Sequence, residues 1–416
     1  MIVAHRSPIR FVLVLSLAFL LLASTVTAEE TPVKVGLLVP LSGDLGPSGQ
    51  LLVRAASLAQ NHINEQGGIL RGRPFEVIVA DDRTDPETGA GAAARLVDEE
   101  GVAGIISVSS SDVALQVSSR VTIPKGVVHL TLATSPRIAD LEDNDLVFRT
   151  VAPDSVQGLA LGRLAARVGY ARVAALHVDN EYGRGLAGAF AAGFAAEGGV
   201  VTASAPFDPG QDAYGPILRE LAATGAEALL LIAYPESGIA ILRESIEGGY
   251  FEDFLFGDGL QSAAVVEALG GALNGAWGTA PSRIGFPATD FVEELFERAY
   301  GPVEQPVYLI ETYEALFLLA LAIEKAGTTD GTAVRDALRD LSAVDGEPVF
   351  PGEWAKAVQL IREGKPIRYY GAPFPLGFDA SGDPELGAIG VWTVIKEKIR
   401  MIASERIVEE SRVYVP

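Results

Sequence analysis

The sequence predicts an α/β protein with two lobes, each a doubly wound parallel sheet. Short runs rich in Val, Ile and Leu lack the polar alternation of a half-exposed strand, as expected of strands that are buried on both faces. Stretches with the period of an amphipathic helix separate these runs, and the whole alternation occurs twice along the chain. Strands that alternate with helices build a parallel sheet covered on both sides.

The expected elements follow in order along the chain. In the first round the expected strands are 33–41, 75–82, 104–108 and 127–133, and the expected helices are 48–68 and 85–101. In the second round the strands are 172–178, 200–207, 228–234 and 253–258, again with helical segments between them. Further helices are expected at 289–300, 306–326, 331–343 and 353–364, before a β-like tail at 388–400. The apolar run 315–323 is flanked by charged residues, which favours a buried helix over a membrane span.

Residues 1–28 are predicted to be a secretory signal peptide. Arg6 and Arg10 form its positive region, 11–23 is an apolar run too short for a comfortable span, and 26–28 supplies small residues for cleavage. The mature chain would then have 388 of the 416 residues, and 30 basic residues would face 54 acidic ones, for a formal net charge of −24. Such an acidic chain is not expected to bind nucleic acid, because phosphate binding needs a basic surface.

The chain contains no cysteine. This excludes disulfides, thiol catalysis, thiolate metal sites and a lipid anchor on an amino-terminal cysteine. Together with the predicted signal peptide, it favours a free periplasmic location.

Three hydroxyls in a row mark the carboxyl end of one expected strand. The stretch 104–115 reads GIISVSSSDVAL, so Ser109, Ser110 and Ser111 follow a buried strand and precede an amphipathic segment. One serine is enough to cap a helix, and a helix start with spare hydroxyls is suited to holding an anion. Ligands of doubly wound sheets bind outside the carboxyl ends of the strands. Asp258 lies at another such end.

No pattern in the chain predicts catalysis, a metal or a cofactor. The histidines are scattered, and neither a Gly-x-Ser-x-Gly elbow nor a P-loop occurs. The stretch 183–188 fits the dinucleotide pattern G-x-G-x-x-G, but it begins several residues after the strand, and Asp179 and Glu181 would repel a pyrophosphate. Close helix–sheet packing is the better explanation for these glycines, and the protein is not expected to be an enzyme.

Seven short motifs stand in an order that resembles one protein family. They are VPLSGDLGPSG (39–49), NEQGGI (64–69), DDRTDP (81–86), ATSPRI (133–138), DNEYGRGLA (179–187), AYPESG (233–238) and GDG (257–259), and the tail YYGAPFPLGFDASGD (369–383) also fits. The family is that of the periplasmic solute-binding proteins of ABC importers for branched-chain amino acids (the leucine/isoleucine/valine-binding proteins).

The resemblance implies a type I periplasmic-binding-protein fold, in which two lobes joined by three crossovers close on a ligand. Lobe one would comprise 29–151 and 282–372, and lobe two 152–281 and 373–416. The crossovers would lie near 150–153, 280–283 and 371–375.

The resemblance also implies which lobe-one residues bind the ligand. Ser110, or Ser111 if the register slips by one, would meet the ligand carboxylate, and Thr134 would touch both the carboxylate and the ammonium. Leu132 is a further candidate. Helix capping by the serines and a turn role for Thr134 stay open as alternatives. Ser48 occupies a position that is often a large aromatic in the family, so the pocket would be roomier or more polar.

In lobe two, the resemblance implies that Asp258 pairs with the ligand ammonium. A desolvated ammonium needs an opposite charge, although Asp258 is shorter than the glutamate of the branched-chain binders, and a turn role stays open. The flanking glycines would let the backbone approach a ligand. Tyr182 would line the pocket, as would either Ala233 or Tyr234.

The expected function is capture of a small α-amino acid and its delivery to ABC permease subunits in the membrane, without a cofactor. Urea, short amides or an aromatic carboxylate are alternative ligands. A ligand-sensing receptor of the same fold is an alternative role.

Overall fold

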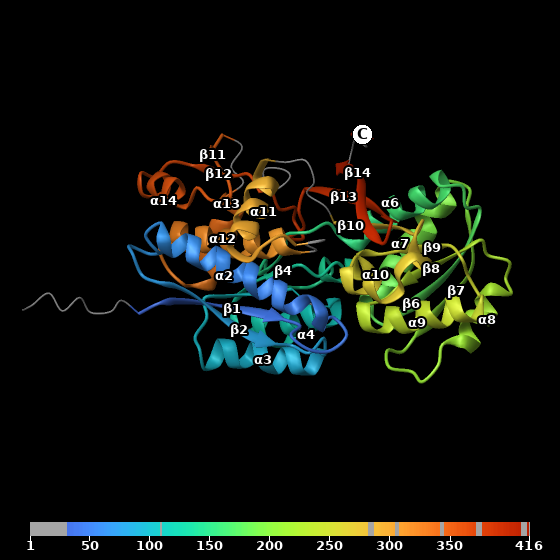
Figure 1. The fold of residues 1–416 in the computed structure, drawn as a ribbon. Helices are drawn as coiled ribbons and strands as arrows, with labels where there is room; N and C mark the ends of the chain where they lie inside the picture. The colour runs from blue at the N-terminus through green and yellow to red at the C-terminus, as the bar shows by residue number, and fades with distance from the viewer. Residues whose placement is uncertain are drawn as a thin grey trace, which may run out of the picture.

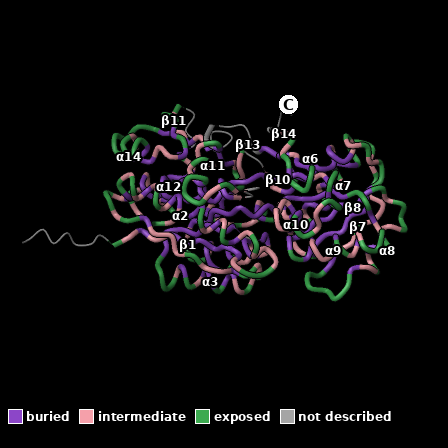
Figure 2. Tube along the Cα trace, viewed as in Figure 1, coloured by how far each residue is buried: buried purple, intermediate pink, exposed green. Residues whose placement is uncertain are grey.

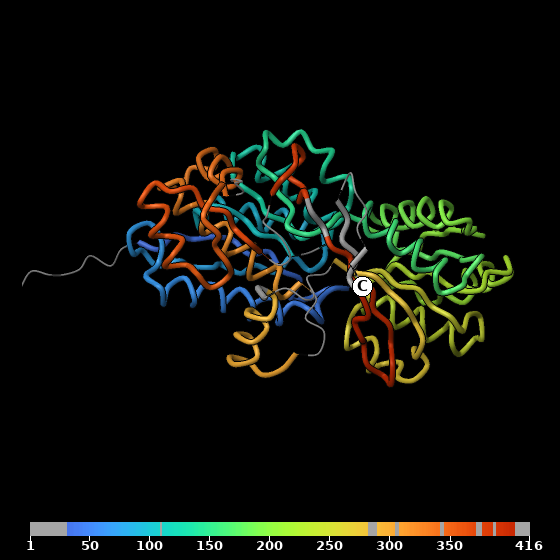
Figure 3. The backbone as a smooth tube through the Cα atoms, turned by 90° about the horizontal axis from the view of Figure 1, so that it is seen from above, coloured from blue at the N-terminus to red at the C-terminus, as the bar shows by residue number. Residues whose placement is uncertain are grey.

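The computed structural model describes residues 31–108, 110–281, 287–303, 308–341, 345–371, 377–408 and 414–415. Figure 1 shows two bodies side by side, each built around its own sheet. Lobe one denotes the five-stranded sheet with the helices packed on it, and lobe two the eight-stranded sheet with its helices. Seen from above, the two lobes again lie beside each other, with the C-terminal strands near their boundary (Figure 3).

The sheet of lobe one is entirely parallel, in the order β2-β1-β3-β4-β5. Its strands are β1 (Val33–Val39), β2 (Phe75–Asp81), β3 (Gly104–Ser107), β4 (Val128–Thr131) and β5 (Val147–Arg149). Four of them match expected strands to within a few residues at each end, because fully buried strands are continuous apolar runs. The three residues of β5 were too few to be recognised.

Helices cover both faces of this sheet. One face carries α2 (Gly49–Glu65) and α12 (Leu309–Ala326), whose side chains join the strands in the main core of the lobe. The other face carries α3 (Pro86–Asp98) and α4 (Ser111–Val117). Helix α12 is buried from Leu309 to Glu324, as Figure 2 shows for this part of the lobe. Among the described residues, no helix is both long and apolar enough to cross a bilayer.

Outside these layers, lobe one carries three further long helices and a small second sheet. The helices are α11 (Pro287–Tyr300), α13 (Gly331–Asp340) and α14 (Trp354–Arg362), and the parallel sheet consists of β11 (Glu347–Val349) and β12 (Ile367–Tyr369). The expected helix at 306–326 starts only at Leu309, because Tyr308 has a left-handed backbone (φ 58°) that an α-helix cannot continue.

The parallel part of the lobe-two sheet repeats the order of lobe one. Its strands are β6 (Arg172–Val178), β7 (Val200–Phe207), β8 (Ala228–Ile232), β9 (Phe254–Phe256) and β10 (Trp277–Pro281), ordered β7-β6-β8-β9-β10. The expected tail forms β13 (Leu386–Ile395) and β14 (Lys398–Val408), joined by a two-residue turn with positive φ at Lys396 and Glu397. Here β13 pairs antiparallel with β10, β14 with β13, and β15 (Tyr414–Val415) with β14. The fold class is confirmed, with this antiparallel edge as an addition.

The helices of lobe two are α6 (Asp154–Arg167), α7 (Glu181–Ala196), α8 (Gly215–Ala222), α9 (Pro235–Gly248) and α10 (Ala263–Leu269). Glycines let α6 and α7 approach closely. A Cβ at Gly162 would lie 2.3 Å from the Phe194 nitrogen, and one at Gly193 would lie 2.7 Å from the Leu159 Cα. The predicted lobe boundaries stay a prediction, and two of the three predicted crossovers fall partly outside the described residues.

Candidate ligand-binding cleft

A small cavity of about 60 Å³ lies between the lobes, next to the carboxyl ends of the strands. Residues of both lobes line it: Pro40, Leu45, Ser48, Leu52, Val108, Leu132 and Tyr308 from lobe one, and Pro235, Asp258, Gly259, Gln261 and Ser262 from lobe two. Three of the predicted site residues therefore line the same cavity, namely Ser48 and Leu132 from lobe one and Asp258 from lobe two. The wall is mostly apolar on the lobe-one side, and Asp258 is its one acidic member.

Asp258 is buried and is held by three neutral donors. It follows β9, and its Oδ1 accepts hydrogen bonds from Gln157 Nε2 and from the Tyr182 hydroxyl, both at 3.0 Å. Its Oδ2 accepts a hydrogen bond of 2.5 Å from the hydroxyl of Tyr308, which reaches across from lobe one. Three of the roughly four acceptor positions of this carboxylate are thus used within the protein. Burial and the Asp258 charge raise the pKa of Tyr182 and Tyr308 well above the usual range, so both phenols remain donors.

The glycines beside Asp258 make room for the protein itself. A Cβ at Gly257 would lie 2.7 Å from the Tyr182 hydroxyl, and one at Gly259 would lie 2.5 Å from the Ala233 carbonyl oxygen. Atoms of lobe two therefore occupy space on the side where these Cβ atoms would lie, while Gly259 also lines the cavity. Close approach of a ligand to this backbone stays a prediction.

The two predicted tyrosines of lobe two stack on each other. The rings of Tyr182 and Tyr234 lie 5.5 Å apart at an angle of 12°. The Tyr182 hydroxyl also accepts from Gly259 N–H, and the Tyr234 hydroxyl accepts from Asn180 Nδ2. The stacked pair therefore packs against the loop that carries Asp258. Neither tyrosine nor Ala233 is among the residues that line the cavity, so which of Ala233 and Tyr234 faces the ligand stays open.

The serine motif caps α4, as one of the two interpretations expects. Ser110 is the N-cap residue, and its hydroxyl accepts from Val113 N–H at 3.4 Å. The hydroxyl of Ser111 accepts from Ser135 N–H at 3.1 Å, which joins this helix start to the loop that carries Thr134. Ser109 lies outside the described residues. Ser110, Ser111 and Thr134 are buried, and their contact with a ligand carboxylate stays a prediction.

Asp154, a residue that sequence reasoning did not select, lies beside this region. It is the first residue of α6, is fully buried, and its N–H donates to the Thr134 carbonyl oxygen at 2.8 Å. Neither of its carboxylate oxygens has a hydrogen-bond partner of normal geometry among the described residues. Burial, reinforced by the charge of Asp258, raises its pKa well above the usual range, and Thr134 and Arg149 offset this only in part.

Two carboxylates of lobe one cap helices of lobe two across the cleft. Asp44 accepts from the backbone N–H and the hydroxyl of Ser237, in the first turn of α9, at 3.0 and 2.8 Å. Asp112 accepts from Glu181 N–H, the first residue of α7, at 3.1 Å. Helix starts favour a negative charge, so each pair attracts the two lobes to each other.

Sequence reasoning missed Tyr308, Gln157, Asp154 and the two cross-lobe caps. Asp154 has the local signature of an acid in the first turn of a helix, which does not distinguish it from many surface acids. Tyr308 lay inside an expected helix, and Asp44 lies in a motif that was used only for its resemblance. None of them carries a local signal of its partner, because these contacts join residues far apart in the chain.

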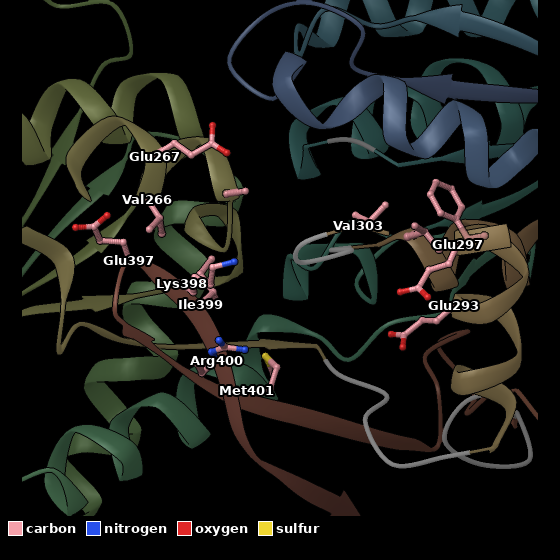
Figure 4. Close-up of a pocket in the computed structure, with 13 residues that line it drawn as sticks. Val266, Glu267, Glu293, Glu297, Val303, Glu397, Lys398, Ile399, Arg400 and Met401 are labelled. Atoms are coloured by element: carbon pink, nitrogen blue, oxygen red, sulfur yellow. The ribbon is translucent and has the colours of Figure 1, made fainter. Parts of the chain in front are cut away.

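A second and wider groove lies at the lobe boundary, outside the predicted site. Figure 4 shows Lys398, Arg400 and Met401 of β14 on one side of it and Glu293 and Glu297 of α11 on the other. Glu267 and Glu397 lie on the same side as Lys398 and Arg400, so the basic and acidic groups of that wall balance. Met401 accepts a hydrogen bond from Gln261 Nε2 at 3.4 Å, so this groove adjoins the inner cavity.

Other chemistry finds little support in the described part of the chain. It contains no cluster of His, Asp and Glu residues suited to a metal ion. Packing explains two of the three glycines of the dinucleotide-like stretch, since a Cβ at Gly183 would lie 2.0 Å from the Val178 carbonyl oxygen, and one at Gly185 would lie 2.9 Å from Pro136 of lobe one. A Cβ at Gly188 would meet no atom within 4 Å.

Comparison with known proteins identifies the family. The family model described as periplasmic binding protein matches residues 32–363. The chain belongs to the periplasmic binding proteins. Its relatives include proteins named for binding leucine, isoleucine and valine, the group that the sequence motifs resemble.

Two curated relatives cover most of the chain. A chemotactic signal transduction system substrate-binding protein of Halobacterium salinarum is 28% identical over 86% of this chain and 86% of its own. A leucine-, isoleucine-, valine-, threonine- and alanine-binding protein of Pseudomonas aeruginosa is 27% identical over 76% of this chain and 84% of its own. Like this binding protein, they are binders and not enzymes.

Solved structures share the fold. A leucine-binding protein of Thermotoga maritima superposes with a TM-score of 0.76 at 23% identity, over 89% of this chain and 98% of its own. A solute-binding protein of Rhodopseudomonas palustris in complex with 3,4-dihydroxybenzoic acid has a TM-score of 0.71 at 18% identity, over 91% and 98%.

Proposed function

We propose that this binding protein captures a small α-amino acid between its two lobes and delivers it to the permease of an ABC importer. The observation that carries the proposal is the cavity between the lobes, which has neutral groups on the lobe-one side and the buried carboxylate of Asp258 on the lobe-two side. An α-amino acid carries one charge of each sign, and it would match such a pair of walls.

The lobe-one side is suited to the ligand carboxylate. Ser110, Ser111 and Thr134 supply hydroxyls next to the start of α4, and such groups hold an anion without a buried cation. Leu45, Leu52, Val108 and Leu132 provide an apolar wall for a side chain. Ser48, also in this wall, adds little bulk, so we do not restrict the ligand to leucine, isoleucine or valine.

Ligand binding would favour closure of the two lobes. The contacts of Asp44 with α9, of Asp112 with α7 and of Tyr308 with Asp258 all join the two lobes. They form only when the lobes meet, and a ligand that touches both lobes shifts the population toward that state. A permease that recognises the closed form would then distinguish loaded from empty protein.

Two alternatives rest on the relatives. The Halobacterium salinarum relative is named for chemotactic signal transduction, so the same capture step would serve a receptor partner. The Rhodopseudomonas palustris structure holds an aromatic acid, which carries no ammonium. The carboxylate on the lobe-two wall favours an amino acid over an aromatic acid, because an unpaired buried charge is costly.

A thermal-shift screen tests the proposal. The chain from residue 29 onward, refolded after removal of any co-purified ligand, is heated with each of the twenty amino acids, urea, short amides and benzoates. A ligand at about 100 times its Kd adds roughly 2.7 kcal/mol of stability and raises the Tm by a few degrees. A response to one or a few amino acids is expected. A response only to benzoates, or to no compound, would contradict the proposed ligand class.

A further inference from the structure

The buried polar groups around Asp258 contain more acceptors than donors. Asp154 has two carboxylate oxygens without a partner, and Gln157 Oε1 and the Thr279 hydroxyl are also buried and without one among the described residues. Gln157 stands one turn after Asp154 on α6, and its Nε2 donates to both Asp258 and the Thr279 carbonyl oxygen, at 3.0 and 3.1 Å. These atoms therefore form one patch of lobe two.

Most of the protein's own donors near this patch are already committed. The hydroxyls of Tyr182 and Tyr308 and the amide of Gln157 all serve Asp258. Arg149 acts on Asp154 by its charge, but its Nε and Nη2 bind Asp383 at 2.7 Å each and its Nη1 donates to the Ser135 carbonyl oxygen at 2.7 Å. The carboxylate of Asp154 interacts with the Thr134 side chain, but among the described residues neither of its oxygens has a hydrogen-bond partner of normal geometry.

We propose that Asp154 is a second acidic group of the ligand site and that the cationic nitrogen of the ligand binds between Asp154 and Asp258. This rests on the proposed function and narrows the ligand to compounds with a cationic nitrogen that carries several N–H donors. An ammonium has three N–H donors. Asp258 has about one acceptor position left for them, so Asp154 takes the larger share.

The contrast with Asp383 supports a role in binding. Both carboxylates are largely or fully buried, and burial raises the pKa of each. Asp383 is held bidentately by Arg149 within the protein, whereas Asp154 has no such partner. A buried carboxyl group whose oxygens lack hydrogen-bond partners costs stability, and residues that bind ligands commonly reduce stability in this way.

Asp154→Asn tests the inference with two readouts, and Asp383→Asn is the matched control. The Asn side chain keeps the shape of Asp154 but removes its charge, so the ligand-free variant should melt at the wild-type temperature or above. Its Kd for the best amino acid of the panel, measured by calorimetry, should rise on the order of a hundredfold. Asp383→Asn should instead lower the Tm. Asp258→Asn should weaken binding by no more than Asp154→Asn does.

Pairs of probes define the ligand class. Each amino acid that binds is compared with its desamino acid and its N-acetyl derivative, which lack the cationic nitrogen, and neither should bind measurably. Wild-type binding of the desamino acid, or an Asp154→Asn variant with an unchanged Kd or a clearly lowered Tm, would overturn the inference while leaving the binding function intact. Wild-type protein that binds no amino acid at all would overturn the proposed function, and this inference with it.

Discussion

The two lobes share a strand order but differ in how their buried polar groups are paired. In lobe one, the imidazole of His129 lies between the hydroxyls of Ser118 and Ser107, at 2.9 and 2.7 Å, and Arg149 is fully engaged by Asp383 and backbone carbonyls. In lobe two, the helix start at Asp154 keeps an unpartnered carboxylate within the described structure. These paired groups stabilise the architecture, and the unpaired carboxylate is the one that we propose binds the ligand.

The difference has a physical basis in desolvation. A buried polar group costs free energy unless the protein supplies its partner. Lobe one supplies the partners from neighbouring strands, as with His129 on β4 and Ser107 on β3. Asp154 is buried without such a partner, which lowers the stability of the ligand-free protein. A bound cationic ligand would supply the missing partner.

Breaking the best-paired group of lobe one should have the largest effect. Arg149→Met leaves Asp383 buried without its cation, and the loss of one partner of such a pair costs about 3–5 kcal/mol. Urea denaturation measures the free energy of unfolding. Arg120→Met is the control, since the Arg120–Glu87 pair is exposed, at 51% and 73%, and should change stability little. Equal losses in the two variants would contradict the comparison.

Acid should weaken lobe one through His129. Burial lowers the pKa of His129 to about 3, against about 6.5 in an unfolded chain. The neutral ring therefore contributes its full stability above about pH 6.5, and that contribution is lost as the pH falls toward 3. Between pH 7 and pH 5 the loss is about 2 kcal/mol. His129→Gln should lack it, so denaturation curves at both pH values should show a smaller decrease for the variant. Parallel decreases would exclude this role for His129.

The smallest expected effect is that of Asp44→Ala, which distinguishes a contribution to lobe closure from a contribution to stability. Asp44→Ala removes the cap that lobe one supplies to α9, and a cap contributes about 1 kcal/mol. The Kd for the best amino acid of the panel should rise about fivefold, with little change in the Tm of the ligand-free protein. Asp85→Ala is the matched control, because Asp85 caps α3 within lobe one, accepting from Thr88 N–H at 2.7 Å. It should lower the Tm and leave the Kd unchanged. The reverse pattern would show that Asp44 does not act in closure.

Part of the candidate site was expected from the sequence, because Asp258 follows a recognisable strand and the family resemblance pointed to the other residues. Ser48, Leu132 and Asp258 line the cavity, and Tyr182 donates to Asp258. The serine motif was ambiguous between cap and anion site, and the structure shows the cap at Ser110. Tyr308 was not recognised, because the left-handed conformation directly before the first residue of α12 leaves no clear mark in the local sequence.

The sequence by itself determined the repeated α/β architecture. Buried parallel strands must be continuous apolar runs and covering helices must be amphipathic, so both periods are written locally in the chain. Only the tertiary structure decided which polar groups meet. The partners Asp44 and Ser237 are 193 residues apart, and Gln157 and Asp258 are 101 residues apart. No local pattern encodes such a pairing, because it depends on how distant elements meet, between the two lobes for the first pair and within lobe two for the second.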